Sequence, residues 1–352
     1  MSGPGPIAPA LLAWFGQNAR ALPFRQDPTP YHIWVSEIML QQTRVAAALE
    51  HYRRFMEALP DIPALAACPD EELFKLWEGL GYYSRARNLK KAAQLVCGKY
   101  GGQLPASYEE LQKLPGVGEY TAGAIASIAF GLSAPAVDGN VLRVFARLYN
   151  DGSNIADPAT KRLFTRRVME QQPAASPGPF NEALMELGAL VCLPGGAPLC
   201  GECPLAEQCL AKAAGTQLEL PVKTPPKARR VQLVTVLVVR SNGRCLLQKR
   251  PETGLLAGLW QPFLFEEALD EGEALARLKA LGLAVNEAAP PRPLKAAKHI
   301  FSHVEWRMRG WELEAAGEAP AGCVWATAEE AAGRYALPGA FKAYRPLLTG
   351  GR

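Results

Sequence analysis

The sequence lacks the features that mark membrane-embedded and exported proteins. Among its 352 residues, no apolar run reaches the length of a membrane span. The first residues, MSGPGPIAPALLAWFG, have neither the basic start and long apolar segment of a signal peptide nor the Arg- and Ser-rich character of a transit peptide. These absences predict a protein of the reducing cytoplasm, without a membrane partner.

The sequence also lacks a strong excess of charge. The formal net charge is +4, and up to Pro225 the chain has 20 Lys and Arg residues against 21 Asp and Glu, whereas after it there are 18 against 13. About half of the residues are apolar and a fifth are charged, as in globular proteins. If the first part binds nucleic acid, it must therefore use local patches and backbone amides.

Hydropathy patterning divides the chain into two parts. From about residue 8 to 212 the apolar residues recur with helical spacing, in stretches 31–59, 71–98, 107–112, 119–130 and 140–149. The Pro-rich basic run at 221–231 is typical of an extended linker. Beyond it, VQLVTVLVVR, SNGR and CLLQKR predict a strand, a turn and a strand, followed by a helix near 266–282 and strands near 311–316 and 323–326. We expect a mainly α domain at 1–220 and a smaller α+β domain at 232–352.

Four of the eight cysteines fall within one short segment. Cys192, Cys200, Cys203 and Cys209 follow the spacing C-x7-C-x2-C-x5-C. Four thiolates in so short a loop can hold one inorganic centre, and the single C-x2-C pair favours a [4Fe–4S] cluster over a zinc ribbon, which usually has two such pairs. Structural disulfides are the other alternative, but nothing marks the chain as secreted, and the remaining cysteines are scattered among apolar residues.

A glycine-containing turn is predicted at Leu114–Gly118, between two short helices. Its sequence, LPGVG, leads directly into Glu119, Tyr120 and Thr121. The glycines permit positive φ angles and close approach of another chain, and the next helix presents free N–H groups and the positive end of its dipole. Such a turn can bind a phosphate without charged side chains, although an ordinary helix–helix connection is the alternative.

Two carboxylates stand out from their surroundings. In a helix, Glu37 has the neighbours Ile33, Trp34, Leu40 and Gln41, so its side chain is expected on a buried face where desolvation raises a carboxyl pKa. The alternative is a solvent-facing Glu in a first turn. Asp138, in VDGN, is well placed as a helix N-cap, which would also hold it ionised. One protonated and one ionised carboxyl group form the arrangement that breaks glycosidic bonds.

These motifs together resemble a known family. The LPGVG turn, VDGN and the four-cysteine loop are similar to the helix-hairpin-helix DNA glycosylases that carry an iron–sulfur cluster. Within that superfamily, SEIMLQQTRV (36–45), GLGYYSRARNL (79–89) and FNEALMELGALVC (180–192) resemble the adenine DNA glycosylases of the MutY type. The resemblance covers essentially the whole chain and implies a helix-hairpin-helix glycosylase domain at 1–220, including the cluster loop 192–209, and a Nudix-like domain at 232–352.

The resemblance implies roles for individual residues of the first domain. Glu37 would protonate the departing adenine and Asp138 would stabilise the cationic sugar, with Tyr120 and Asn140 supporting that centre. The adenine pocket would be lined by Arg25 and Glu182. DNA contacts would come from residues that fill the stack after base flipping and from the hairpin: Gln42, Tyr82, Leu114, Gly116, Val117, Gly118 and Thr121. Of Tyr82 and Tyr83, at least one is expected to be an ordinary core aromatic.

Tyr120 separates two branches of the superfamily. In the related endonuclease III-type lyases this position is a lysine that forms a Schiff base, which a tyrosine cannot do. A water-using, monofunctional glycosylase is therefore expected, acting as a monomer on duplex DNA with adenine opposite 8-oxoguanine or guanine, in the cytoplasm near the nucleoid of a bacterial-type cell. The alternatives are a glycosylase/lyase acting on oxidised pyrimidines and a non-catalytic, redox-sensing DNA-binding protein.

The C-terminal part resembles the Nudix-like domain that reads 8-oxoguanine in this family. Phe301, Ser302 and His303 match its F-S-H loop, with Ser302 as the expected contact to the oxidised base. The segment EGEALARL (271–278) lacks the R-E-x-x-E-E type of metal-binding pattern, so binding without hydrolysis is expected.

Two positions depart from the family pattern. The first cysteine gap has seven residues where six are usual, so the loop 194–198 must bulge, and Phe24 replaces a frequent Trp. The cluster is expected to fold the DNA-contacting loop 193–199 rather than to transfer electrons.

Overall fold

The computed structural model describes residues 3–196, 198–225 and 228–351. The chain divides by its internal contacts into two units. The first comprises residues 1–67 and 88–226, and the second comprises residues 68–87 and 227–352. The segment Cys68–Arg87, which lies inside the predicted helical domain, thus packs with the C-terminal part of the chain. Of the predicted linker 221–231, residues 226 and 227 lie outside the described ranges.

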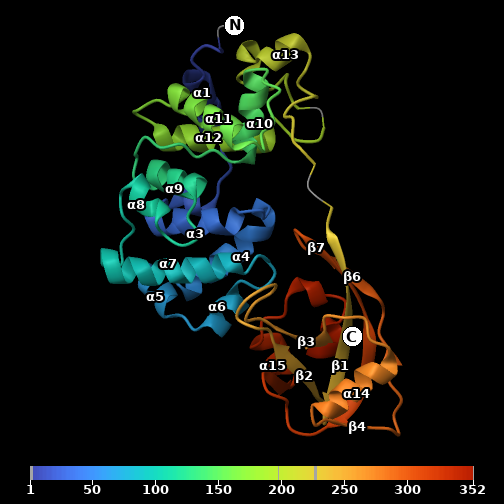
Figure 1. The fold of residues 1–352 in the computed structure, drawn as a ribbon. Coiled ribbons are helices and arrows are strands. Elements are labelled where there is room, and N and C mark those ends of the chain that lie inside the picture. Colours follow the sequence, from blue (N-terminus) through green and yellow to red (C-terminus); the bar gives the residue numbers. More distant parts are fainter. Residues whose placement is uncertain (1–2, 197, 226–227, 352) are drawn as a thin grey trace. The chain divides into compact units, whose positions relative to one another are not determined.

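The first unit is built from helices (Figure 1). They are α1 (Ala8–Asn18), α2 (Pro23–Gln26), α3 (Pro30–Leu40), α4 (Val45–Ala58), α5 (Ile62–Ala67), α8 (Tyr108–Gln112), α9 (Glu119–Ala124), α10 (Gly139–Leu148), α11 (Pro158–Gln171), α12 (Pro177–Leu190) and α13 (Leu210–Ala214). Helix α7 (Ser84–Tyr100) begins in the second unit and continues into the first. No helix among the described residues combines the length and apolar character needed to span a bilayer.

Local sequence explains where the helices that carry the site begin. Thr29 caps α3 by accepting a hydrogen bond from the His32 backbone N–H, and Pro30 occupies the first helical position, where its missing N–H costs nothing. Asp138 caps α10 in the same way, by accepting from the Val141 backbone N–H. The predicted cap at Asp138 is confirmed.

Two of the predicted helical stretches are interrupted. The stretch 31–59 forms α3 and α4, separated at 41–44, where Gln42 has a φ of 57°. The stretch 71–98 forms α6 (Asp70–Leu76) and α7, separated at 77–83 by a loop in which Tyr82 has a φ of 47°. A non-glycine residue rarely adopts positive φ, so the apolar periodicity alone does not indicate these breaks.

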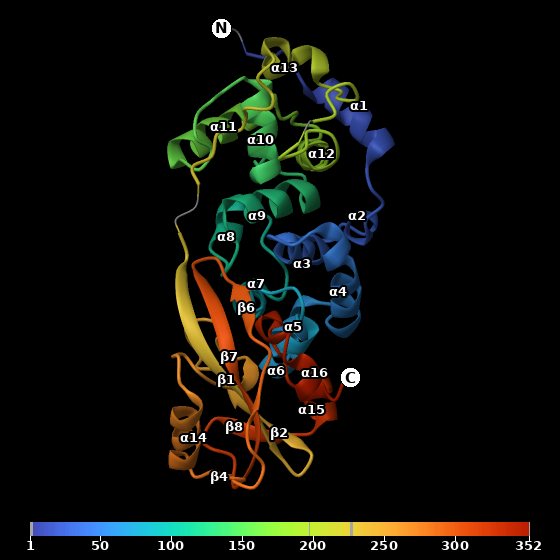
Figure 2. The same ribbon diagram turned by 90° about the vertical axis from the view of Figure 1, so that its right-hand side faces the viewer.

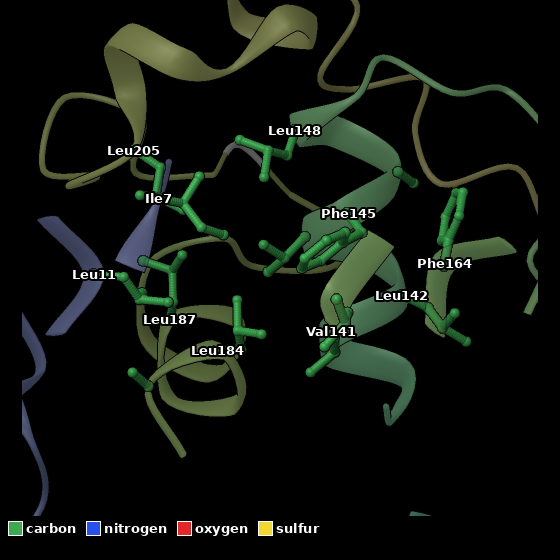
Figure 3. Close-up of a cluster of buried hydrophobic side chains, with 14 of the residues drawn as sticks. Ile7, Leu11, Val141, Leu142, Phe145, Leu148, Phe164, Leu184, Leu187 and Leu205 are labelled. Carbon is green, nitrogen blue, oxygen red and sulfur yellow. The ribbon is translucent and has the colours of Figure 1, made fainter. Parts of the chain in front are cut away.

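The core of the first unit lies between α1, α10, α11 and α12. Figure 3 shows Leu11 of α1, Phe145 of α10, Phe164 of α11 and Leu184 of α12 meeting in one cluster. Leu205, from the cysteine segment, belongs to the same cluster, and Cys192, Cys203 and Cys209 pack against it. The helix that starts at Asp138 is therefore buried against the segment that carries the four cysteines.

The second unit contains a mixed eight-stranded sheet (Figure 2). Its strands run in the order β4-β7-β1-β3-β2-β8, and β5 and β6 also pair with β7. The strands are β1 (Arg230–Ser241), β2 (Arg244–Lys249), β3 (Trp260–Phe265), β4 (Ala284–Val285), β5 (Arg292–Pro293), β6 (Ala297–Ile300), β7 (Val304–Ala316) and β8 (Cys323–Ala326). The predicted strand–turn–strand is formed by β1 and β2, and Asn242 and Gly243 both have the positive φ angles of a tight hairpin turn.

Helices cover both faces of this sheet. Leu278 of α14 (Glu271–Ala280) packs with Leu237 of β1 and Leu313 of β7. On the other face, Val236 of β1 and Trp306 of β7 pack with Phe341. The C-terminal part of this unit also contains α15 (Ala328–Gly333) and α16 (Arg345–Thr349). The mainly α first part and the α+β second part are as the sequence predicts.

Candidate active site

Glu37 lies in the third turn of α3 and is buried, with 8% of its surface exposed. The Tyr120 hydroxyl, from the second residue of α9, donates a 2.6 Å hydrogen bond to Glu37 Oε2. Burial raises the pKa of Glu37 from 4.5 to about 7, against this hydrogen bond, which lowers it, and with a smaller upward contribution from Asp138. The alternative of a solvent-facing first-turn carboxylate is wrong, and Glu37 can carry a proton near neutral pH.

Asp138 is held by the start of the helix that it caps. Its Oδ1 accepts from the Val141 N–H and its Oδ2 from the Asn140 Nδ2, both at 2.8 Å. Burial raises the pKa of Asp138, and these hydrogen bonds lower it by less, so the cap alone does not set its ionisation. Gly188 of α12 permits the close approach to Asn140, because a Cβ at this glycine would lie 2.6 Å from the Asn140 Cβ.

Four charged side chains form a network that joins α2 and the loop before it to α12. Arg25 Nε donates to Glu182 Oε1 at 2.8 Å, and its Nη2 donates to Glu186 Oε2 at 3.1 Å. Arg20 binds Glu186 through its backbone N–H and two side-chain nitrogens. Burial raises the pKa of Glu182, whereas at Glu186 the bonds from Arg20 and Arg25 outweigh burial and lower the pKa to about 2. Glu186 is therefore an ionised anchor for both arginines.

These groups line one cavity of about 940 Å³. The two carboxylates Glu37 and Asp138 share it with Tyr120 and Asn140, and the Arg25–Glu182 pair lies in its wall. Phe24, at the position where relatives often have Trp, also lines it and makes an edge-to-face contact with Tyr52 at 5.6 Å. The residues predicted for catalysis and for the adenine pocket are thus brought together in a space of the size that encloses small ligands.

The hairpin residues differ in what they can offer a partner. Gly116 and Gly118 are both exposed. Gly116 has a positive φ of 78°, whereas Gly118 has a φ of −88°. The side chains of Leu114 and Val117 are buried, at 2% and 4% exposure, and their backbone N–H groups donate to the Leu111 and Leu114 carbonyls within the turn. Thr121 is also buried, and its hydroxyl accepts from Gln41 Nε2 at 3.2 Å.

The two predicted wedge residues share an unusual conformation. Both Gln42 and Tyr82 are exposed and have positive φ angles, 57° and 47°. Such a conformation costs of order 1–3 kcal/mol and is common at ligand-binding positions. By contrast, Tyr83 is buried and packs edge-to-face on Phe74, which makes it the core aromatic of the pair.

The four clustered cysteines line a second, smaller cavity and are free thiols. Arg147 of α10 donates to Cys192 Sγ at 3.2 Å and to the Leu193 carbonyl at 2.9 Å, and Arg143 donates to the Cys192 carbonyl at 2.8 Å. Burial raises the pKa of Cys203 to about 11. Within the described ranges, no three His, Cys, Asp or Glu side chains converge tightly enough to hold a single metal ion. Of the loop 194–198, residue 197 lies outside those ranges.

The predicted recognition loop connects β6 and β7 in the second unit. Phe301 is anchored, with its ring 5.1 Å from that of Trp306 and its carbonyl accepting from Arg229 Nε at 3.1 Å. Ser302 and His303 are exposed. The Ser302 and Tyr82 hydroxyl oxygens lie 3.4 Å apart.

Sequence reasoning missed the residues that hold the site in place. Arg20 and Glu186 anchor the pocket arginine, and Arg143 links Asn140 to the cysteine segment through bonds to Asn140 Oδ1 and the Cys192 carbonyl. The pairing of Arg20 with Glu186 gives no local signal, since the two residues are 166 positions apart. The one available clue is helical spacing, which places Glu186 one turn after Glu182.

Comparison with known proteins identifies the family. Residues 35–170 match the HhH-GPD superfamily base excision DNA repair protein, and residues 234–345 match the NUDIX domain. The adenine DNA glycosylase of Homo sapiens is 34% identical over 97% of this chain and 74% of its own length. That of Buchnera aphidicola subsp. Acyrthosiphon pisum is 32% identical over 83% of this chain and 82% of its own. The solved structure of a thermostable thymine-DNA glycosylase is 29% identical in sequence to this chain. Its match covers 59% of this chain and 95% of that glycosylase, with a TM-score of 0.53. The chain therefore belongs to the adenine DNA glycosylases, enzymes of base excision repair.

Proposed function

We propose that this enzyme removes adenine mispaired with 8-oxoguanine, and with guanine, by hydrolysis and without cutting the strand. The observation that carries the proposal is that Glu37 and Asp138 line the same cavity, where Tyr120 of α9 donates a hydrogen bond to Glu37. Two carboxyl groups in different environments are what glycosidic cleavage requires, one to donate a proton and one to stabilise positive charge.

Glu37 supplies the proton. With a pKa of about 7, a large share of the enzyme holds Glu37 protonated at neutral pH. Its carboxyl group donates this proton to a ring nitrogen of the flipped adenine, the N-glycosidic bond breaks, and its electron pair leaves with the base. Since adenine departs as a neutral molecule, the barrier is lower than for an anionic leaving group.

Asp138 stabilises the cation that remains on the sugar. The bonds from Asn140 and the Val141 N–H orient its carboxylate, and Arg143 in turn holds Asn140. Water then adds to the anomeric carbon and loses one proton, which replaces the proton that Glu37 donated, and the product is an abasic site.

Tyr120 supports the assignment to the monofunctional branch. Its hydroxyl is committed to Glu37 at 2.6 Å and also contacts Met185 Sδ at 3.1 Å. A phenol cannot form an imine with the sugar, so strand cleavage through a Schiff base has no nucleophile at this position.

Arg25 and Glu182 suit recognition of adenine. The base has a donor amino group beside acceptor ring nitrogens, and the pair presents an acceptor carboxylate beside a donor guanidinium. Their mutual 2.8 Å bond fixes the spacing of the two groups. An adenine bound there would be read by complementary hydrogen bonds, which discriminate strongly against bases that lack a partner.

The DNA would be held by the hairpin and by the two positive-φ residues. Backbone N–H groups near Gly116 and Gly118 suit phosphate contacts, and the exposed Gln42 and Tyr82 suit filling the stack after the adenine leaves it. In the second unit, the exposed Ser302 would contact the 8-oxoguanine. The same unit would not hydrolyse nucleotides, since one acidic side chain of α14, Glu273, is used in the capping box with Asp270.

The four cysteines suit one [4Fe–4S] cluster. Free thiols around one cavity fit such a group, and Arg147 donates a hydrogen bond to Cys192 Sγ at its edge. When bound, the cluster would cross-link the segment 192–209. Its role would be to order this segment, which packs on the core below α10.

The test is single-turnover cleavage of a duplex with one adenine opposite 8-oxoguanine, followed by alkali, with wild type beside Glu37→Gln. Alkali-dependent breaks at that adenine, abolished by the substitution, are expected. Breaks without alkali, together with a borohydride-trapped complex, would instead identify a lyase. Absence of adenine release would refute the substrate.

A further inference from the structure

The segment Cys68–Arg87 is joined to the C-terminal sheet unit by several contacts. Arg87 Nη1 donates to the Ala257 carbonyl at 2.6 Å, and Lys75 Nζ donates to the Tyr335 carbonyl at 3.4 Å. The Phe74 ring lies directly over Gly258, where a Cβ would be 3.7 Å from it. The loop that carries Tyr82 therefore belongs structurally with the domain proposed to read 8-oxoguanine.

Glu78 is the centre of this attachment. Its Oε1 accepts from the Leu337 backbone N–H at 2.9 Å and from Arg345 Nη2 at 2.8 Å, and its Oε2 accepts from Lys75 Nζ at 2.7 Å. The side chain is only 11% exposed. A carboxylate with three donors in a desolvated position is a strong and directional link. Leu337 and Arg345 come from the C-terminal part of the chain, and Lys75 comes from α6.

The loop that follows Glu78 has positive φ angles at three positions up to Tyr82. Gly79 and Gly81 have φ angles of 102° and 68°, and Tyr82 has a φ of 47°. The Gly81 carbonyl accepts from Trp77 Nε1 and from Arg85 Nη2, both at 3.1 Å. Such a conformation persists only where its surroundings determine it, and Glu78 lies at the fixed end of this loop.

Tyr82 emerges from the loop beside the tip of β6–β7. The residue is 48% exposed, and its hydroxyl oxygen is 3.4 Å from Ser302 Oγ. One side chain suited to enter the base stack and one suited to touch the opposite base thus lie side by side within one unit. Their spacing depends on how the loop is attached to the sheet.

We infer that Glu78 is a positioning residue which fixes the Tyr82 loop to the sheet domain. Tyr82, which would enter the base stack, and Ser302, which would contact the 8-oxoguanine, are thereby held at a fixed spacing. The inference rests on the proposed function and deepens it by assigning the selectivity for 8-oxoguanine over guanine partly to this attachment. Ser302 then contacts the oxidised base in the same binding step in which Tyr82 inserts into the base stack. If the attachment is lost, the two loops must become ordered when DNA binds, and this entropic cost reduces the binding free energy gained from the contacts with 8-oxoguanine.

The test compares adenine release opposite 8-oxoguanine and opposite guanine, at limiting and at saturating enzyme. The variants are Glu78→Gln, Arg345→Ala and Arg345→Lys in the full chain. Arg334→Ala is the matched control, because it breaks a neighbouring link to Glu71 that is 3.8 Å long and exposed on both sides. Thermal unfolding of each variant and the fluorescence of a 2-aminopurine placed beside the 8-oxoguanine are measured in parallel.

We expect Glu78→Gln and Arg345→Ala to lower the preference for 8-oxoguanine by about tenfold, equivalent to about 1.4 kcal/mol. The rate at saturating enzyme should change much less, the 2-aminopurine signal should weaken, and Arg345→Lys should restore the preference. Arg334→Ala should behave as wild type.

Equal losses on both duplexes, or an unchanged preference in a folded Arg345→Ala protein, would overturn the inference while the proposed function stands. A wild-type protein that releases adenine from neither duplex would refute the proposed function itself. If Glu78→Gln does not fold, Arg345→Ala and Arg345→Lys decide the question.

Discussion

Replacing Glu37 by Gln should make the protein more stable at alkaline pH while abolishing its activity. Glu37 is buried in α3, and Gln keeps its shape and can still accept the hydrogen bond from Tyr120. What the substitution removes is the negative charge that burial opposes. Ionisation of a buried catalytic acid lowers the free energy of unfolding, and this loss of stability should be measurable.

The magnitude follows from the pKa. It rises from 4.5 to about 7 on folding, and each pKa unit corresponds to about 1.4 kcal/mol, so the ionised group costs about 3 kcal/mol. Because the folded-state pKa is raised, the stabilising contribution is complete below pH 4.5 and is lost as the pH rises through about 7. Gln does not titrate, so the variant should lack this loss.

Denaturant unfolding of wild type and Glu37→Gln at about pH 5 and about pH 8 measures the effect. The gain in the free energy of unfolding should be larger at the higher pH by about 2–3 kcal/mol. Glu57→Gln, on the exposed face of α4, is the control and should show no pH-dependent gain. A gain that is absent, or equal at both pH values, would show that Glu37 isn't desolvated as described.

Four further outcomes are expected. The single-turnover rate of adenine release should fall about tenfold per pH unit above a midpoint near 7, as Glu37 loses its proton, and a flat profile would contradict its role as the acid. Tyr120→Phe should move that midpoint upward, because the lost hydrogen bond lowers the pKa of Glu37; a downward move would contradict this. Glu186→Gln should lower the free energy of unfolding by about 3 kcal/mol and slow adenine release, because Arg20 and Arg25 lose a buried partner; unchanged stability in denaturant would argue against the network. Cys203→Ser should reduce folding or DNA affinity more than the chemical step, and single-turnover rates at saturating enzyme that fall far more than binding would refute it.

Much of the candidate site is readable in short stretches of sequence. Three of the four neighbours of Glu37 at one helical turn are apolar, and the side chain is indeed buried. Asp138 stands directly before a helical pattern, and it caps α10. Alternation in VQLVTVLVVR and the SNGR turn specify β1 and its hairpin. The Asp138 cap and the hairpin turn are interactions within a few residues, so the local pattern contains them.

The helix breaks illustrate where local patterns are insufficient. Residues 31–59 have an uninterrupted apolar periodicity without Gly or Pro between 41 and 44, yet α3 ends at Leu40 and Gln42 takes a positive φ. The chain adopts this conformation because packing of α3 and α4 outweighs the local preference. The strand β3 also escapes prediction, and its partner β1 lies well before it in the sequence. The strand β6 escapes prediction too, although it pairs with the directly following strand β7.

The sequence by itself determined the chemistry available to this protein: four clustered thiols, an acid on an apolar helix face, a capping aspartate and a tyrosine in place of a nucleophilic lysine. Only the tertiary structure decided how these groups are held. It brings Glu186 to both Arg20 and Arg25, Arg147 to Cys192, and Glu78 to Arg345. The physical reason is that burial and charge pairing depend on residues far apart in the chain, and their proximity is a property of the packed core.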